Sequence, residues 1–427
     1  MIIYYKVANY KSIKKEVTLN FIATGLSEHN DSNIIRNDRG SFLKSIVLYG
    51  HNASGKSKIL DSLVFFKWFV NNSAIEKQSN EPISVEPYEF NENTAKKPSF
   101  FEIAFYLGSK KYRYGFEADK NTIYKEWLLE SRVKKEFPVF LRINQDIEID
   151  SKRFENSGDL DKRTRKNALF LSVASQWNVQ KAQKINDWFQ NIYTIHGLTD
   201  DNYRDITIKL LKDKNYTNLI NQFIRKADLG ITSVDLVDVP IKLDNLINKV
   251  PDKFKELFKE TFEERSETAV LANHNKYNDE NKIIGKVPLL MNKSESEGTK
   301  KYFNMIGLLV LALKEGHFVV IDEFDGRLHT LLTKAILKLF NSSKITSNAQ
   351  LLVASHDVAL LDRRLLRRDQ IYFVEKNPLG ESKVTSLVEF KPRKEAPYYK
   401  NYLEGKYGAI PFVEDLENLI SNEETKA

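Results

Sequence analysis

Short hydrophobic runs separated by polar turns dominate the first 130 residues of the chain. The runs are rich in β-branched and aromatic residues, which is typical of strands. We expect strands at residues 1–7, 16–22, 45–49, 100–107, 111–117 and 122–129. Turn residues at 108–109 and 119–121 separate the last three runs, so this region predicts an antiparallel meander. Apolar residues at helical spacing predict one helix over 56–71.

The pattern changes to helical spacing between residues 174 and 275. We expect helices at 180–193, 205–212, 216–227 and 252–264. The sequence has no sustained heptads, so a long coiled-coil arm is not expected. The pattern predicts a helical insertion over 174–275, which we interpret as a lobe that binds a partner or effector.

Helices and apolar strands alternate after Gly298. We expect helices at 299–314, 328–340 and 359–368, and strands at 318–321, 351–354, 371–374 and 383–390. This alternation favours a parallel sheet covered by helices on both faces. The predicted fold is therefore α/β, with an N-terminal lobe at 1–173, the insertion at 174–275 and a C-terminal lobe at 276–427.

Composition excludes several classes of protein. The 427 residues are 41% hydrophobic and 29% charged, which is ordinary for a globular chain. The absence of cysteine excludes disulfide scaffolds, thiolate zinc sites and cysteine nucleophiles. The longest apolar run, 306–313, is far shorter than the roughly 20 residues of a membrane helix. Because the N-terminus also lacks a signal-peptide pattern, we expect a cytoplasmic protein without membrane contact.

The net charge of +7 favours polyanionic partners. However, 65 basic residues exceed 58 acidic residues by only that amount, so charge alone leaves nucleic-acid binding open.

A phosphate-binding motif follows the predicted strand at 45–49. It reads Gly50, His51, Asn52, Ala53, Ser54, Gly55, Lys56 and Ser57, and it matches G-x-x-x-x-G-K-[ST] at every fixed position. Small residues let backbone N–H groups surround phosphates, and the start of the next helix adds positive partial charge. We expect Lys56 to bind the β- and γ-phosphates of ATP and the Ser57 hydroxyl to coordinate Mg²⁺.

Two acids end the apolar strand at 318–321. Asp322 and Glu323 would lie at the carboxyl edge of the parallel sheet, where the phosphate-binding loop also lies. We expect Asp322 to hold the Mg²⁺ and Glu323 to accept a proton from the attacking water. An acidic turn after a strand is common, so this interpretation depends on the upstream motif.

The next strand ends in Ser355, His356 and Asp357. Consecutive residues on an extended chain point to opposite sides, so these three do not form a serine-hydrolase relay by themselves. A single histidine beside the two acids is better suited to sensing the γ-phosphate. A purely structural role for His356 is the alternative.

The order of these motifs resembles that of the ATP-binding-cassette (ABC) ATPases. With Asn52 at its third position, the phosphate-binding motif resembles that of the branch that contains SMC, RecF and the overcoming-lysogenization-defect (OLD) ATPases. The segments at 294–300 (SESEGTK), 322–329 (DEFDGRLH) and 402–411 (YLEGKYGAIP) resemble OLD-like ATPases of phage-defence operons, of the RloA and abortive-infection AbiL type. This resemblance covers nearly the whole chain and implies an ABC-type P-loop fold.

The resemblance implies further roles. Ser296, Gly298 and Thr299 stand where the signature motif does, which in this family contacts the γ-phosphate bound by a partner subunit. In this family two chains enclose two ATP molecules, and Asp325 matches the D-loop residue that communicates between the two ATP sites. His356 matches the family's switch histidine. The family thus implies a homodimer or higher homo-oligomer around two ATP molecules. A polar loop that caps a helix is the alternative interpretation of residues 296–299.

Some positions depart from the family pattern or match it weakly. Glu297 replaces a glycine of the usual signature, which puts its γ-phosphate contact in doubt. Gln78 is the nearest candidate for the Q-loop glutamine, and Lys11 and Ser12 lie where relatives touch nucleotide. OLD nucleases continue into a Toprim domain, but the residues that follow His356 show no E…DxD pattern. We therefore expect the effector, a nuclease in our interpretation, to be a separate protein, with nucleic acid or a phage-derived molecule as the trigger.

Two other functions stay open at this stage. A DNA-repair ATPase of the RecF/SMC type would show ATPase activity that DNA stimulates strongly and that salt suppresses. A transporter cassette is disfavoured by the N-terminal meander and the long insertion.

Two further features have ordinary interpretations. His274 has no acid at ligand spacing nearby in the sequence and is expected to be structural. The pairs Arg363–Arg364 and Arg367–Arg368 either form a solvated helix face or contact a phosphate backbone or the acids of a partner.

Overall fold

The computed structural model describes the chain except residues 77, 79, 133–134, 197–200, 241–265 and 411–427. The described residues form two compact units. The first comprises Met1–Gly197, Ala312–Gly326 and Thr333–Ala427, and the second comprises Leu198–Leu311 and Arg327–Leu332. Among the described helices, none has both the length and the apolar character that crossing a membrane requires.

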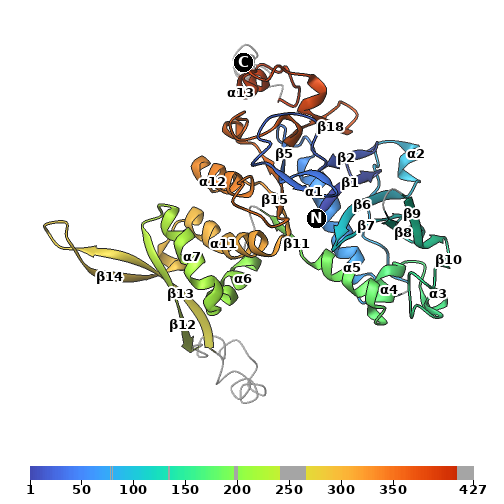
Figure 1. Ribbon diagram of the computed structural model, residues 1–427, viewed down its shortest axis with the longest axis horizontal. Coiled ribbons are helices and arrows are strands. Elements are labelled where there is room, and N and C mark those ends of the chain that lie inside the picture. Colours follow the sequence, from blue (N-terminus) through green and yellow to red (C-terminus); the bar gives the residue numbers. More distant parts are fainter. Residues whose placement is uncertain (77, 79, 133–134, 197–200, 241–265, 411–427) are drawn as a thin grey trace, which may run out of the picture. The chain divides into compact units, whose positions relative to one another are not determined.

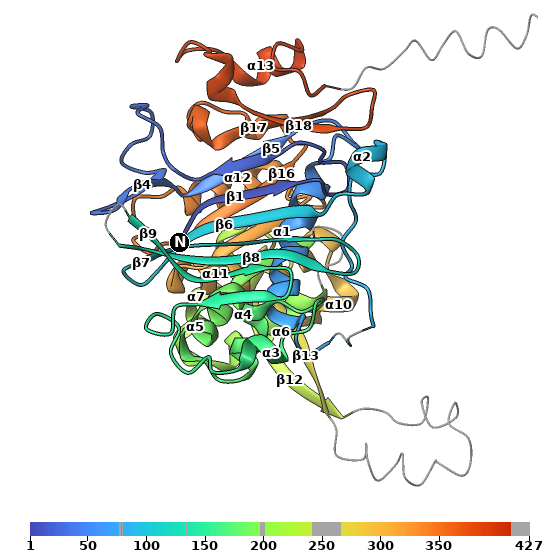
Figure 2. The ribbon, with the colours of Figure 1, turned by 90° about the vertical axis from the view of Figure 1, so that its right-hand side faces the viewer.

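The first unit contains a seven-stranded antiparallel sheet with the order β10-β9-β8-β7-β6-β1-β2. Its strands are β1 (Ile2–Ala8), β2 (Val17–Asn20), β6 (Ser99–Leu107), β7 (Lys110–Ala118), β8 (Ile123–Arg132), β9 (Lys135–Ile143) and β10 (Asp146–Ile149). Figure 2 shows β6 and β1 side by side in this sheet. The predicted meander is confirmed, and it continues into β9 and β10, which the sequence pattern missed. A separate hairpin joins β3 (Ile34–Asn37) and β4 (Gly40–Leu43).

The second sheet of this unit has the order β11-β15-β16-β5-β17-β18. Its strands are β5 (Ser45–Tyr49), β11 (Ile192–His196), β15 (Phe318–Asp322), β16 (Gln350–Ser355), β17 (Ile371–Lys376) and β18 (Ser382–Ser386). The first five strands in the order are parallel, and β18 pairs antiparallel with β17. The expected α/β fold with antiparallel and parallel sheets is therefore confirmed.

Helix α1 (Lys56–Asn72) contributes to the core that both sheets share. Phe66 on its buried face contacts Phe101 and Phe116 of the antiparallel sheet, at ring-centroid distances of 6.4 and 5.3 Å. The same core includes Ile46 of β5 and Val320 of β15. The helix is thus fixed along its length by apolar packing, which also fixes its first turn after the phosphate-binding loop.

The remaining helices of the first unit are short or amphipathic. They are α2 (Glu92–Ala95), α3 (Leu160–Arg163), α4 (Phe170–Gln176), α5 (Gln180–Gln190), α12 (Thr330–Phe340, whose first residues belong to the second unit) and α13 (Tyr398–Leu403). The helix predicted over 180–193 ends at Gln190, because the following residues pair with β15 as β11.

Two predictions in the C-terminal region were wrong. The helix expected over 359–368 is replaced by two 3-10 turns, η2 (Val358–Leu360) and η3 (Arg368–Gln370). The strand expected over 383–390 ends at Ser386, because Ser386 and Glu389 form a capping box that starts the 3-10 turn η4 (Leu387–Phe390).

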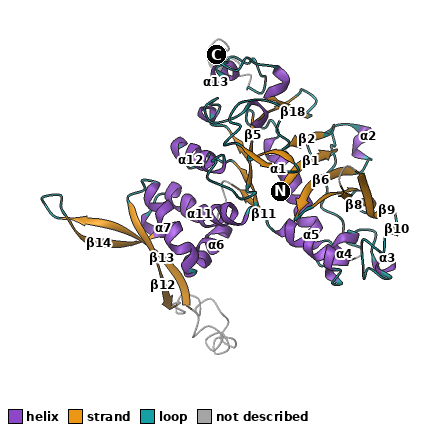
Figure 3. Ribbon diagram, in the orientation of Figure 1, coloured by secondary structure: helices purple, strands orange, loops and turns teal. Residues whose placement is uncertain are grey.

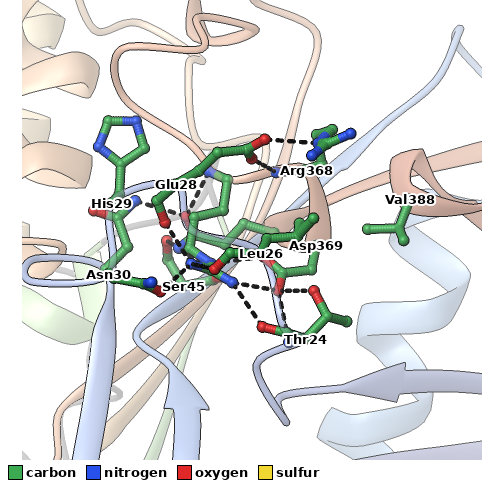
Figure 4. Close-up of polar contacts among 12 residues, drawn as sticks. Thr24, Leu26, Glu28, His29, Asn30, Ser45, Arg368, Asp369 and Val388 are labelled. Carbon is green, nitrogen blue, oxygen red and sulfur yellow. Dashed lines mark hydrogen bonds and ion pairs between the residues drawn. The ribbon is translucent and has the colours of Figure 1, made fainter. Parts of the chain in front are cut away.

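The second arginine pair, near η3, differs from the sequence interpretations, whereas Arg363 and Arg364 are exposed, as a solvated face would be. Arg367 and Arg368 are largely buried in ion pairs with Asp369 and Glu28, at 2.9 and 2.7 Å. Figure 4 shows Arg368 beside Glu28, and Asp369 beside Thr24. Arg367 and Arg368 therefore tie the 24–30 loop to η3 and are not a solvated face.

The second unit combines helices with a three-stranded antiparallel sheet (Figure 3). Its elements are α6 (Asp201–Lys212), α7 (Lys214–Lys226), β12 (Ile231–Pro240), β13 (Ser266–Tyr277), β14 (Ile283–Leu290), α10 (Met291–Ser294) and most of α11 (Glu297–Glu315). The expectation of a helical insertion over 174–275 missed this sheet, and the second unit begins at Leu198 and extends beyond residue 275. The helix predicted over 252–264 lies outside the described residues.

Candidate nucleotide-binding site

The phosphate-binding loop connects the end of β5 to the start of α1. All five residues of β5 are buried, so the loop begins from a fixed strand. Gly55 has φ +109°, a conformation that favours glycine, and α1 begins at the next residue. A Cβ on Gly50 would lie 2.2 Å from the Val374 carbonyl oxygen, so this position also requires glycine. The free N–H groups of the first turn of α1 form an anion site at the loop.

A serine from β18 supports this loop, and the motif gave no indication of it. The Ser382 hydroxyl donates a hydrogen bond to the Ser54 carbonyl at 2.8 Å and also contacts the Ser12 hydroxyl at 2.8 Å. A Cβ on Gly55 would lie 2.0 Å from the Ser382 oxygen, which explains the glycine in steric terms as well. The sequence analysis expected a strand over 383–390, directly after Ser382, which is too general a signal to single out this residue.

The Lys56 ammonium lies inside the loop. It donates hydrogen bonds to the carbonyl oxygens of Gly50 at 2.7 Å and His51 at 3.2 Å. Burial lowers the pKa of Lys56 to about 8, and the nearby carboxylates of Asp322, Asp325 and Glu323 partly oppose that decrease. Lys56 is therefore close to the acids that follow β15 and is positioned for an anionic ligand.

Sheet order places the acidic residues near the loop. Strand β16 lies between β5 and β15, and all three are parallel, so their carboxyl ends share one edge. Asp322 ends β15 and is buried, with its Oδ1 accepting a hydrogen bond from the Glu323 N–H at 3.0 Å. Glu323 has φ +46°, uncommon for a residue other than glycine, which marks a constrained turn directly after Asp322.

His356 lies at the same edge, at the end of β16. Its backbone N–H donates to Asp325 Oδ1 at 3.1 Å, and its Nδ1 is 3.5 Å from the Lys56 ammonium. Burial and the charge of Lys56 lower the pKa of His356, against the opposing effect of Asp325, Glu323 and Asp322. The structure thus brings together Lys56, Asp322, Glu323, Asp325 and His356, and the lowered pKa of His356 favours the neutral imidazole.

The residues at this edge fit Mg·ATP. Ser57 offers a hydroxyl from the first turn of α1, and Asp322 offers a buried carboxylate that acts electrostatically on Lys56. Magnesium is commonly held by one or two such oxygen ligands together with substrate phosphates. In the described part of the chain, no three His, Cys, Asp or Glu side chains group as a separate metal site.

The predicted signature residues belong to the second unit. The Ser296 hydroxyl accepts a hydrogen bond from the Thr299 N–H at 3.2 Å and so caps α11. Glu297, in the place of a glycine, pairs with Lys300 at 2.9 Å and with Arg327 at 3.4 Å. A Cβ on Gly298 would lie 2.6 Å from the Arg327 carbonyl oxygen. The segment is therefore a well-ordered helix start with a paired acid.

His274 has an acidic partner that its sequence neighbourhood did not indicate. Its Nε2 lies 2.7 Å from Glu295 Oε1, next to Ser296. This contact joins β13 to the turn before α11 and is consistent with the expected structural role.

The weaker candidates differ in their surroundings. The Lys11 ammonium lies 3.4 Å from Asp61 of α1, and Ser12 contacts Ser382 beneath the loop. Gln78 is exposed, and its backbone carbonyl accepts a hydrogen bond from Asn167. Ser12 is therefore next to the phosphate-binding loop, whereas no observation links Gln78 to it.

Strand order, loop and acids together define a P-loop ATPase fold. Residues 45–362, which are 318 of 427, match the AAA_21 family, described as "AAA domain, putative AbiEii toxin, Type IV TA system". The chain belongs to this family. No curated protein matches it significantly.

Several solved structures are similar to this chain at low identity. The SMC head domain from Thermotoga maritima is 15% identical to this chain, and the alignment covers 90% of this chain and 98% of the SMC head chain, with a TM-score of 0.40. An SMC head bound to the C-winged helix domain of ScpA is 15% identical over 90% and 97%, with a TM-score of 0.42. The cbiO1 protein of Clostridium perfringens, part of the ABC transporter complex cbiONQ, is 12% identical over 95% and 97%, with a TM-score of 0.32.

Proposed function

We propose that this protein is a Mg²⁺-dependent ATP-binding and ATP-hydrolysing switch of the OLD-like, ABC class. The observation that carries the proposal is the convergence of Lys56, Asp322, Glu323 and His356 at the ends of β5, β15 and β16. Nucleotide hydrolysis needs a loop that binds phosphate, an acid that binds the metal ion and a second acid that accepts a proton.

Each residue has one role in the proposed reaction. Lys56 and the N–H groups at the start of α1 bind the phosphates. Ser57 and Asp322 would hold the Mg²⁺, which neutralises phosphate charge when it is bound. Glu323 accepts a proton from the attacking water, and neutral His356 contacts the γ-phosphate.

The composite site of the proposed dimer uses the second unit. Ser296 of the partner subunit and the start of its α11 would face the γ-phosphate, with Gly298 and Thr299 completing the contact. The support is the position of Ser296 at the N-terminal end of the 19-residue helix α11, where helix N–H groups favour an anion; its hydrogen bond with the Thr299 N–H is the cap that the alternative interpretation expects. Asp325 would communicate between the two sites, because it joins the His356 backbone to the turn after Asp322.

We further propose that the switch controls a separate effector, a nuclease in our interpretation, in defence against phage. The support is the resemblance of residues 294–300, 322–329 and 402–411 to OLD-like defence ATPases. The family description, which names a toxin of a toxin–antitoxin system, also favours a defence role. A DNA-repair ATPase of the RecF/SMC type is the second candidate, favoured by the net charge of +7.

Steady-state and single-turnover ATPase assays test the proposal. Glu323→Gln is expected to bind Mg·ATP as tightly as the wild type and to hydrolyse it about 10²–10⁴-fold more slowly, because an amide accepts no proton at neutral pH. Unchanged turnover would remove Glu323 as the base. The same assay with duplex DNA at two salt concentrations separates the candidates, since strong, salt-sensitive stimulation favours the DNA-repair function.

A further inference from the structure

The segment 398–410, at the C-terminal end of the described residues, contacts the phosphate-binding loop directly. The His51 N–H, in the second position of the loop motif, donates a hydrogen bond to the Ala409 carbonyl at 2.9 Å. The Tyr402 hydroxyl donates to the same carbonyl at 3.0 Å. One buried carbonyl therefore connects the loop to helix α13.

Aromatic packing fixes this segment on the strands next to the loop. Tyr402 and Tyr407 stack on Phe373 of β17, with ring centroids 5.4 and 5.1 Å apart. Tyr49, which directly precedes the loop on β5, lies 6.4 Å from Tyr402. The segment thus packs on both β5 and β17 at the point where the loop leaves the sheet.

The backbone of the segment is shaped for this contact. Gly405, Gly408 and Ala409 all have positive φ, at +75°, +64° and +59°. Alanine is disfavoured in this conformation, so its presence at 409 indicates that the surrounding contacts hold it there. A Cβ on Gly408 would lie 2.6 Å from Glu375 Oε2, which is the movable end of a side chain, so an alanine there is disfavoured mainly by the φ of +64° and would strain the backbone next to the Ala409 carbonyl.

We propose that residues 398–410 are a positioning element for the phosphate-binding loop. The Ala409 carbonyl holds the His51 amide and keeps the loop in its phosphate-binding shape before ATP arrives. This inference rests on the proposed function, because the ligand of the loop is taken to be ATP. The element contacts the phosphate-binding loop at His51, so its effect is expected on nucleotide binding rather than on the hydrolysis step.

Two variants and one matched control test the element. Gly408→Ala is expected to raise the KM for ATP about tenfold, with kcat within twofold of the wild type. Tyr402→Phe removes one hydrogen bond to Ala409 but keeps the stacking, so a smaller rise in KM is expected. Tyr399→Phe removes a hydroxyl from the exposed side of the same helix and should change neither constant.

Hydrogen–deuterium exchange without nucleotide tests the contact independently of ATP. The His51 amide should exchange slowly in the wild type and in Tyr399→Phe, and at least tenfold faster in Gly408→Ala or Tyr402→Phe. The inference would be overturned if both variants, Tyr402→Phe and Gly408→Ala, fold and show unchanged exchange of the His51 amide and an unchanged KM. If Gly408→Ala does not fold, the result for Tyr402→Phe alone decides. If the wild type does not bind ATP, the proposed function is wrong. The exchange of the His51 amide still tests the hydrogen bond between His51 and Ala409 in that case.

Discussion

Replacing Arg367 with methionine should destabilise the first unit strongly, although the residue lies in a sequence of four closely spaced arginines. Its guanidinium is fully buried and donates hydrogen bonds to both oxygens of Asp369 at 2.9 Å. It also donates to carbonyls of Thr24, Leu26 and Glu28 and to the Asn30 side chain.

The magnitude follows from what the substitution leaves behind. Within the described part of the chain, the Asp369 carboxylate would keep the hydrogen bonds from the N–H and hydroxyl of Thr24, and the loop carbonyls would lose the Arg367 donor. Removing one partner of a buried ion pair costs about 3–5 kcal/mol. At about 2 °C per kcal/mol for a unit of this size, the Tm should fall by roughly 6–10 °C.

Thermal and urea unfolding of Arg367→Met and Arg364→Ala provide the assay. Arg364 is 85% exposed and pairs with Asp362 at 2.7 Å, so its removal should change the free energy of unfolding by less than about 1 kcal/mol. Arg367→Met combined with Asp369→Leu should recover part of the loss, because no buried charge is then unpaired. The reasoning is refuted if Arg367→Met costs no more than Arg364→Ala.

Three further predictions concern the site and its surroundings. Lys56→Ala should lose most affinity for Mg·ATP, since charge-assisted hydrogen bonds contribute about 1.5–3 kcal/mol each, and wild-type affinity in calorimetry would remove Lys56 from the site. Burial raises the pKa of Glu130, but hydrogen bonds from Lys181 and Lys110 outweigh it and lower the pKa to about 2. At pH 7 the wild type should therefore unfold at a higher urea concentration than Glu130→Gln. This difference in urea midpoint should shrink as the pH falls from about 4.5 towards 2, because the Glu130 carboxylate becomes protonated. A difference that stays constant over this pH range would contradict the prediction. The purified protein is expected to hydrolyse ATP without cutting DNA or RNA, and nuclease activity that a substitution in this chain abolishes would contradict the separate effector.

The parts of the molecule that the sequence predicted well have local signals. Strand β5 and helix α1 flank a motif whose glycines and lysine are fixed by the chemistry of phosphate binding, and β15 is an apolar run that ends in two acids. Their placement follows from the rule that carboxyl ends of parallel strands share an edge. Burial and neighbouring charges then act on Lys56 as this arrangement leads one to expect.

The features that the sequence did not reveal depend on distant contacts. Ser382 reaches Ser12 across 370 positions, and Arg367 reaches Glu28 across 339. The local sequence around Ser382 or Arg367 does not show whether the side chain is buried against a partner or exposed to solvent. The sheet of β12, β13 and β14 was missed because its apolar and polar residues do not alternate regularly: β14 is a mostly apolar run that is largely exposed, and β13 combines buried Val270 and Ala272 with several polar residues.

The central claim is that ATP is bound between two copies of this chain. Light scattering on a sizing column measures the mass of Glu323→Gln with and without Mg·ATP, and with Ser296→Arg added to the same variant. Slow hydrolysis should keep the composite site closed, so ATP should double the mass of Glu323→Gln relative to its nucleotide-free form. Ser296→Arg should abolish this change, because a bulky cation prevents closure on the γ-phosphate. The same mass with and without ATP, or equal doubling in the double variant, would contradict the composite site.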